Sequence, residues 1–250
     1  MRKISYDTIT RKGPSHTKNQ DSLMIYYNRF KRLGFLLICD GIGGYFGGDV
    51  ASKIASEIVY KNFIKKDKDV SWHNWMIATI KEIKVEFISA IKKNSMLKEM
   101  STTLCLAIVD TKHKKVLVMN LGDSMCMVYN KNGQKHQLVN QHTFYNYLVR
   151  TKQDIEMAKA EKGEAYLHSL VNFVAANSPA EIWFDEIEYD LQDDDVLIVC
   201  SDGIYKFLSV ENFIFKNKTP KDICKLFLNN AMENSTTDDA SIGVMKYEIK

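Results

Sequence analysis

The sequence predicts an α+β protein whose strands are mostly antiparallel and whose helices pack outside them. Three observations support this fold class. Short apolar or alternating runs, typical of strands, occur in separate groups along the chain. Longer stretches with apolar residues at helical spacing lie between these groups. Neighbouring strands are joined by short polar connections typical of hairpins, as at Asp110–Lys114 and Asn132-Gly133.

The first group of strands begins near the N-terminus. Ile4–Ile9 alternates weakly and predicts an edge strand, and the polar loop Arg11–Ser22 follows it. Leu23–Tyr27 predicts a second strand, which turns through Asn28–Arg32. Leu33–Cys39 is short, continuous and apolar, so we expect a buried strand there.

Two helices are expected next. Apolar residues recur at helical spacing from Val50 to Val59, and Asp49 lies in the first turn, where the helix dipole favours a negative charge. A second helix with an apolar stripe is expected over Ser71–Lys93.

The rest of the chain alternates between strand and helix patterns, and it contains no internal repeat or low-complexity linker. Further strands are expected at Thr103–Val109, Lys115–Asn120, Met125–Tyr129, Ile182–Tyr189, Asp195–Cys200 and Ala240–Ile249. Helical patterns cover Gln141–Lys162, Ser209–Phe215 and Pro220–Met232. We therefore expect one domain over residues 1–250.

Composition excludes several classes of protein. The 250 residues carry 34 basic and 31 acidic side chains, a formal charge of +3, which does not indicate nucleic-acid binding. The N-terminal MRKISYDTIT has no apolar signal core, and no apolar segment is long enough to cross a bilayer. The five cysteines show no CxxC spacing and fit buried thiols in a reducing compartment. We expect a cytoplasmic monomer with neither nucleic-acid nor membrane partners.

The strongest local signal is the stretch LGFLLICDGIGGYFGGD. Asp40 ends the buried strand, and the glycines that follow allow the backbone to approach a ligand closely. A carboxylate at the end of a rigid strand, with the Gly41 carbonyl beside it, suits a hard cation such as Mg²⁺ or Mn²⁺. The alternative is a Gly-rich turn with Asp40 as a solvated cap.

Other acidic residues occupy similar places. Asp202 and Asp238 lie at strand ends, Asp123 lies in a turn between strands, and Asp21 lies in a loop between strands. If the strands stack in neighbouring sheets, their ends bring these carboxylates together. Clustered carboxylates repel one another, and bound cations offset that repulsion. Each aspartate alone is also explained as a turn or cap residue, so the joint pattern carries the argument.

Six motifs in order make the sequence resemble the PPM/PP2C family of metal-dependent protein Ser/Thr phosphatases in its bacterial form. The match spans nearly the whole chain. The motifs are Asn19-Gln20-Asp21-Ser22, Asp40-Gly41-Ile42-Gly43-Gly44, Ser101-Thr102-Thr103, Gly122-Asp123-Ser124-Met125, Ser201-Asp202-Gly203 and Asp238-Asp239-Ala240-Ser241.

This resemblance implies a central antiparallel β-sandwich flanked by helices on both faces, a four-layer αββα arrangement with metals at one end. The segment from about 141 to 180 would form the family's flap, a lid-like insertion. By similarity, Asp40 would bridge two Mn²⁺ or Mg²⁺ ions, and the Gly41 carbonyl would bind one of them. Asp202 and Asp238 would hold the other ion. Asp123, with Asp202, would bind a third, weaker ion.

The resemblance also implies a reaction on phosphoserine and phosphothreonine in proteins, opposing a Ser/Thr kinase. Two divalent cations lower the pKa of a shared water, and the resulting hydroxide attacks phosphorus. Asp21 would orient the metal-bound waters. No cysteine lies in a phosphate-cradling loop, which argues against a thiol-based phosphatase.

Four positions depart from the family pattern. His16 stands where the family has an arginine that grips the substrate phosphate. The alternatives are that protonated His16 replaces that arginine, that Arg11 or Lys12 substitutes for it, or that the loop differs and His16 is a surface residue. Met125 replaces a second arginine, and Ile42 cannot donate a proton to the leaving group. Asp239 replaces an asparagine, which adds charge beside Asp238 and leaves the choice of ligand between the two open.

Two alternatives to a protein phosphatase remain. The missing arginine favours a catalytically weak or inactive module that binds a phosphoprotein or a regulatory partner. A metal-dependent phosphoesterase acting on a small phosphate ester is the other.

Overall fold

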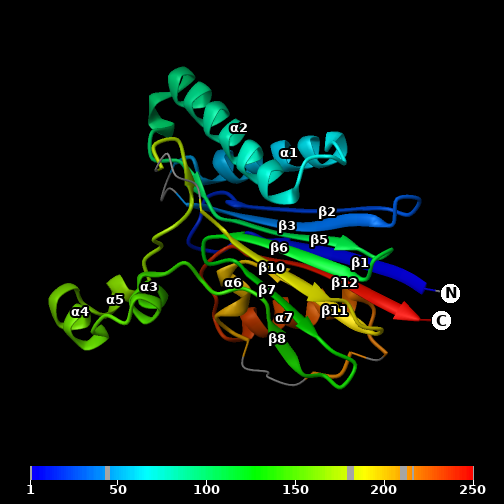
Figure 1. The fold of residues 1–250 in the computed structure, drawn as a ribbon. Coiled ribbons are helices and arrows are strands. Elements are labelled where there is room, and N and C mark those ends of the chain that lie inside the picture. The colour runs from blue at the N-terminus through cyan, green and yellow to red at the C-terminus, as the bar shows by residue number, and fades with distance from the viewer. Residues whose placement is uncertain (1, 43–45, 179–182, 209–212, 216, 250) are drawn as a thin grey trace.

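The computed structural model describes residues 2–42, 46–178, 183–208, 213–215 and 217–249. Two antiparallel sheets stack face to face, and helices cover the outer face of each (Figure 1). The predicted α+β class and four-layer sandwich are therefore confirmed.

The first sheet has five strands, and its order places the two ends of the chain side by side. β1 is an edge strand, as predicted, and it pairs with β12 along its whole length. In spatial order the strands are β1 (Arg2–Arg11), β12 (Ala240–Ile249), β11 (Asp195–Cys200), β7 (Met125–Tyr129) and β8 (Lys135–Gln137).

The second sheet has seven strands, with β3 near its centre. Its main path is β10 (Asp185–Asp190), β6 (Lys115–Leu121), β5 (Leu104–Asp110), β3 (Leu33–Ile42), β4 (Ser101–Thr102) and β9 (Val174–Ala175). β2 (Asp21–Asn28) pairs with β3 and places Asp21 opposite Asp40.

The continuous apolar run of β3 is explained by burial on both faces. Leu36 and Ile38 belong to the core that joins the two sheets. Phe35, Leu37 and Cys39 belong to the second core, beneath the helices. Both cores hold Asp40, the residue that follows this run, at a fixed position.

Three long helices supply the outer layers. α1 (Gly48–Lys65) and α2 (Trp72–Lys93) cover the seven-stranded sheet, and α7 (Pro220–Glu233) covers the five-stranded sheet (Figure 1). The sequence predicted all three. α7 begins with a capping box between Thr219 and Asp222, which satisfies the free N–H groups of its first turn. No helix in the described ranges is long and apolar enough to span a bilayer.

Within the segment from 141 to 178, residues 144–167 leave the sandwich and form three short helices at one side of it (Figure 1), and Val174–Ala175 rejoin the second sheet as β9. The three helices are α3 (Phe144–Thr151), α4 (Ile155–Lys162) and α5 (Glu164–Leu167). The last two residues of the expected flap, 179 and 180, lie outside the described residues.

Two local expectations differ from the structure, and one short helix beside the candidate site was not expected. The strand expected over Ile182–Tyr189 begins at Asp185, and residue 182 lies outside the described residues. Of the helix expected over Ser209–Phe215, residues 209–212 also lie outside them, and Phe213 to Phe215 are not helical. There, the Phe213 N–H donates to the Gly133 carbonyl of the neighbouring hairpin at 2.8 Å, in place of a helical bond. A short helix, α6 (Asp202–Tyr205), was not predicted.

Candidate metal centre

Six of the residues singled out from the sequence line a single cavity of about 250 Å³ at one end of the sandwich. They come from five separate stretches of the chain. They are His16, Asp40, Gly41, Asp123, Asp202 and Asp238. Asp21 is not among the lining residues and lies opposite Asp40 on the neighbouring strand. The fold therefore brings the distant aspartates together, as the strand-end argument predicted.

The backbone on both sides of the Asp40 carboxylate is fixed by threonines. The Asp40 N–H donates to the Thr103 hydroxyl at 2.9 Å. The Asp40 carbonyl accepts from the Thr102 hydroxyl at 2.9 Å and from the Thr103 N–H at 2.8 Å. The Ser101-Thr102-Thr103 motif thus positions Asp40, a function that its sequence does not reveal.

Gly41 is required by close backbone packing. A Cβ at this position would lie 2.2 Å from the Gly48 carbonyl oxygen and 2.6 Å from the Gln20 carbonyl oxygen. The Gly41 N–H donates to that Gln20 oxygen at 3.1 Å. Glycine therefore lets the start of α1 and the loop before β2 meet behind the cavity.

The Asp21 side chain is held in place by Ser201, which is itself bound to the backbone of Ser241. Its Oδ2 accepts from the Ser201 hydroxyl at 2.8 Å, and that hydroxyl accepts from the Ser241 N–H at 3.0 Å. The second carboxylate oxygen of Asp21 is buried without a partner among the described residues. Burial, with smaller contributions from the charges of Asp239 and Asp202, raises the pKa of Asp21 to about 7.

Asp202 and Asp123 also line the cavity. Asp202 begins α6, and its Oδ2 accepts from the Lys206 ammonium one turn later at 2.5 Å. Its other oxygen is buried and unpartnered among the described residues. Burial, and then the charge of Asp202, raise the pKa of Asp123 to about 7. We did not single out Lys206 from the sequence, although its i+4 spacing from Asp202 is a recognisable helical pair.

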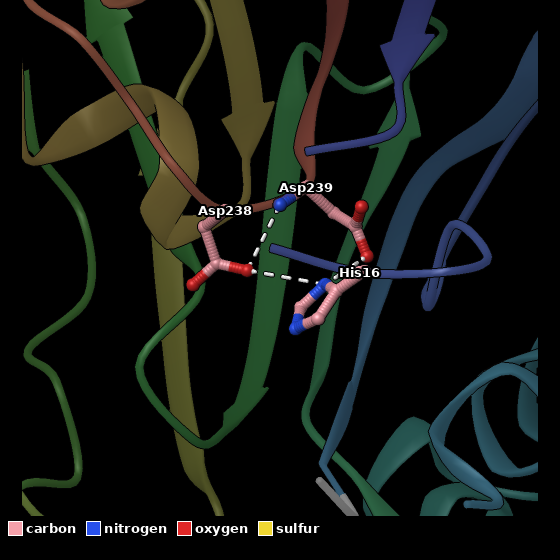
Figure 2. Close-up of side chains that lie close together, drawn as sticks. All are labelled: His16, Asp238 and Asp239. Carbon is pink, nitrogen blue, oxygen red and sulfur yellow. Dashed lines mark hydrogen bonds and ion pairs between the residues drawn. The ribbon is translucent and has the colours of Figure 1, made fainter. Parts of the chain in front are cut away.

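Figure 2 shows His16, Asp238 and Asp239 close together. The His16 Nδ1 lies 2.9 Å from Asp239 Oδ2 and 3.7 Å from Asp238 Oδ1. Asp239 is buried, and its carboxylate also accepts from the N–H groups of Gly13 at 2.7 Å and Gln20 at 2.6 Å. Asp239 therefore anchors the 13–20 loop, whereas Asp238 lines the cavity.

The residue types that line this cavity suit divalent cations, and the ligand atoms of His16, Asp238 and Asp239 lie within 4.8 Å of one another. The cavity offers four carboxylates and the peptide group of Gly41, which are the oxygen ligands that Mg²⁺ and Mn²⁺ prefer. Burial, and then the charges of Asp21 and Asp202, raise the pKa of Asp40 well above its usual value. Buried carboxylate oxygens without partners, combined with mutual repulsion, indicate a site that positive charge stabilises.

Comparisons with known proteins agree with this geometry. The family model for protein phosphatase 2C matches residues 12–238. A putative protein phosphatase of Mycoplasma pneumoniae is 28% identical over 252 residues, covering 93% of each chain. The serine/threonine phosphatase stp of Listeria innocua is 24% identical and covers 93% of this chain and 92% of its own.

Solved structures show the same fold. A bacterial serine phosphatase superposes with a TM-score of 0.79 at 26% identity and 99% coverage of both chains. The catalytic domain of the phosphatase PstP in complex with two manganese ions has a TM-score of 0.77 at 17% identity and full coverage of both chains. The second likeness bears on the fold alone.

Proposed function

Because this chain belongs to the protein phosphatase 2C family, we propose that it hydrolyses phosphoserine and phosphothreonine in proteins with the help of Mn²⁺ or Mg²⁺. The observation that carries the proposal is the convergence of Asp40, Asp123, Asp202 and Asp238 on one cavity. The substrate is then a phosphorylated protein, and the enzyme opposes a Ser/Thr kinase in the cytoplasm, acting as a monomer.

The family resemblance, together with the shared cavity, supports the following assignment of residues to ions. Asp40 and the Gly41 carbonyl would bind one ion, and Asp40, Asp202 and Asp238 a second. Asp123, with Asp202, would bind a third, weaker ion. Divalent cations at such a site activate water as a nucleophile and neutralise charge on the phosphoryl oxygens. The two-manganese complex of the structural neighbour PstP supports a pair of ions.

The chain's own residues orient and confine the reaction. Ser201 holds Asp21 directly behind Asp40, so Asp21 would position waters bound in the cavity. Asp239 holds the His16 ring at the cavity wall, where His16 would contact the substrate phosphate in place of the family's arginine. Ile42 also lines the cavity and carries no proton to donate to the leaving group.

The test combines turnover with metal binding. Hydrolysis of p-nitrophenyl phosphate and of a phosphothreonine peptide is measured against Mn²⁺ concentration, and Mn²⁺ affinity is measured by calorimetry. Asp40→Asn and Asp202→Asn should each reduce turnover and Mn²⁺ affinity by more than about 100-fold. Loss of a residue that only supports a metal ligand already reduces metal affinity or activity by about 10–100-fold. Asp67→Asn, an exposed aspartate in the α1–α2 connection, is the matched control.

Three outcomes contradict the proposal. Turnover that survives both substitutions refutes the assigned site. Absence of turnover at every Mn²⁺ concentration indicates a binding module, and a strong preference for small esters over the peptide indicates a different phosphoesterase.

A further inference from the structure

A second and larger cavity, of about 670 Å³, lies at the end of the sandwich remote from the candidate metal centre. We call it the distal groove and define it by Tyr26, Lys31, Leu33, Phe63, Lys68 and Trp72. Leu33 begins β3 and Asp40 lies close to its other end. Seven residues of extended strand separate them, which is about 23 Å. A ligand in the distal groove therefore does not touch the metal centre.

The floor of the distal groove is a rigid aromatic cluster. The Phe63 ring stacks on Trp72 with centroids 5.7 Å apart and meets Tyr26 edge-on at 6.0 Å. The Lys66 ammonium lies 4.4 Å from the centroid of Trp72. Phe63 is buried and Trp72 is half-buried, so the Trp72 ring supplies the accessible aromatic edge of the groove, beside which an apolar side chain would be desolvated.

The rim of the distal groove is positively charged. Lys31 and Lys68 form no ion pair with any residue that the structure describes. Asp110 is the acidic residue found among the described lining residues. Its carboxylate already accepts from the His113 ring at 2.7 Å and from the Lys112 N–H at 2.9 Å. These hydrogen bonds leave Asp110 charged, and three lysines (Lys31, Lys66 and Lys68) against this one carboxylate give the described lining a net positive charge.

An exposed apolar surface extends beyond the groove. Phe30 is fully exposed, at 100%, between two lining residues, Asn28 and Lys31. The hairpin that carries it is held in place, because the Asn28 side chain accepts from the Phe30 N–H at 3.0 Å and from the Lys31 N–H at 2.9 Å. Ile64, which lines the groove, and Val70 are also exposed, at 42% and 40%. Exposed apolar side chains at and near a cavity favour an interaction site.

We propose that the distal groove docks an acidic segment of a partner protein, with an aromatic side chain of that segment packed against the accessible edge of Trp72. The acidic character follows from the unpaired Lys31 and Lys68. The exposed apolar residues outside the cavity favour an extended segment over a small ligand, which would leave them uncovered. The groove favours a protein over a bilayer, because a side chain of a partner segment can enter a cavity of this size whereas the flat surface of a bilayer cannot. The docking is independent of phosphatase chemistry.

The test uses a fluorescein-labelled dodecapeptide containing six Glu and two Phe residues in a Gly/Ser background, titrated with the full chain at low salt. We expect saturable binding that weakens as salt rises, because surface charge pairs are screened. Replacing Phe by Ser in the peptide, or Glu by Lys, should abolish it. Lys31→Glu combined with Lys68→Glu should raise the Kd at least tenfold, and Phe30→Ser at least threefold.

The matched control is Lys221→Glu combined with Lys225→Glu, the same charge change at exposed positions of α7 on the other face. It should change the Kd less than twofold, and circular dichroism should show all variants folded. Absence of saturable peptide binding overturns the proposal, as does an equal effect of the control pair. Sedimentation with vesicles containing 30% phosphatidylserine that depends on Phe30 and Lys31, without peptide binding, also overturns it and assigns the surface to membranes.

Discussion

Asp21 makes the stability of the metal-free protein depend on pH in a direction opposite to that of an ordinary salt-bridged aspartate. Its pKa is raised from 3.8 to about 7, chiefly by burial. The folded chain therefore holds a proton that the unfolded chain releases. This contribution to stability is fully present below pH 3.8 and is lost as the pH rises through about 7.

The expected size follows from the shift. One pKa unit corresponds to about 1.36 kcal/mol, so the free energy of unfolding should fall by about 2 kcal/mol between pH 5.5 and 8.5 through Asp21 alone. For a chain of this length, that is a decrease of roughly 4–8 °C in Tm. Asp21→Asn removes the titrating group and keeps an oxygen for the Ser201 hydroxyl, so this part of the slope should vanish.

The assay is thermal unfolding in EDTA at several pH values, for wild type, Asp21→Asn and the exposed control Asp67→Asn. Mn²⁺ should oppose the trend, since binding to the ionised folded site stabilises it most at high pH. An identical pH dependence of Tm in wild type and Asp21→Asn would refute the reasoning, because the buried carboxyl would then not titrate differently in the two states.

Three further substitutions test the supports of the cavity. Ser201→Ala should lower the free energy of unfolding in urea by about 1–3 kcal/mol, because the buried Asp21 side chain and the Ser241 N–H both lose their hydrogen-bond partner. An unchanged urea midpoint would show that the Ser201 hydroxyl does not stabilise them. Gly41→Ala should lower Tm far more than Gly243→Ala. A Cβ at position 41 would lie 2.2 Å from a backbone oxygen, whereas the nearest atom to a Cβ at position 243 would be 3.4 Å away. Equal decreases in Tm would contradict this packing. Asp239→Ala should destabilise the protein by about 1–3 kcal/mol and weaken phosphate binding, because the carboxylate accepts from the Gly13 and Gln20 N–H groups and from the His16 ring. Asp239→Asn should have an intermediate effect. A greater loss of stability in Asp239→Asn than in Asp239→Ala would contradict the anchoring role.

The sequence predicted the elements whose pattern is set by burial. Leu33–Cys39 is apolar at every position except Gly34 because both faces of β3 are covered, and the period of Val50–Val59 reflects one helix face on that sheet. Where tertiary contacts override the local pattern, prediction failed. Phe213 and Phe215 look helical in sequence, yet their rings stack 4.9 Å apart and the Phe213 N–H bonds to another hairpin.

The site was predictable at the level of residue type and position. Carboxylates at strand ends were expected to meet, and they line one cavity. The different positions of Asp238 and Asp239 could not be predicted. They depend on which of the two carboxylates accepts from the N–H groups of a loop more than 200 residues earlier in the chain. The distal groove also left no sequence signal, since its aromatic residues come from β2, α1 and the start of α2 and its lysines from the connections between these elements.

The pairing of β1 with β12 has a consequence for biosynthesis. The two strands pair from Arg2 with Ile249 to Arg11 with Ala240. β1 therefore lacks its partner in the sheet until β12 has been synthesised. Asp238 and Asp239 immediately precede β12, and the loop carrying His16 is fastened to them. This end of the molecule can therefore assemble only after residues 238–249 have been synthesised.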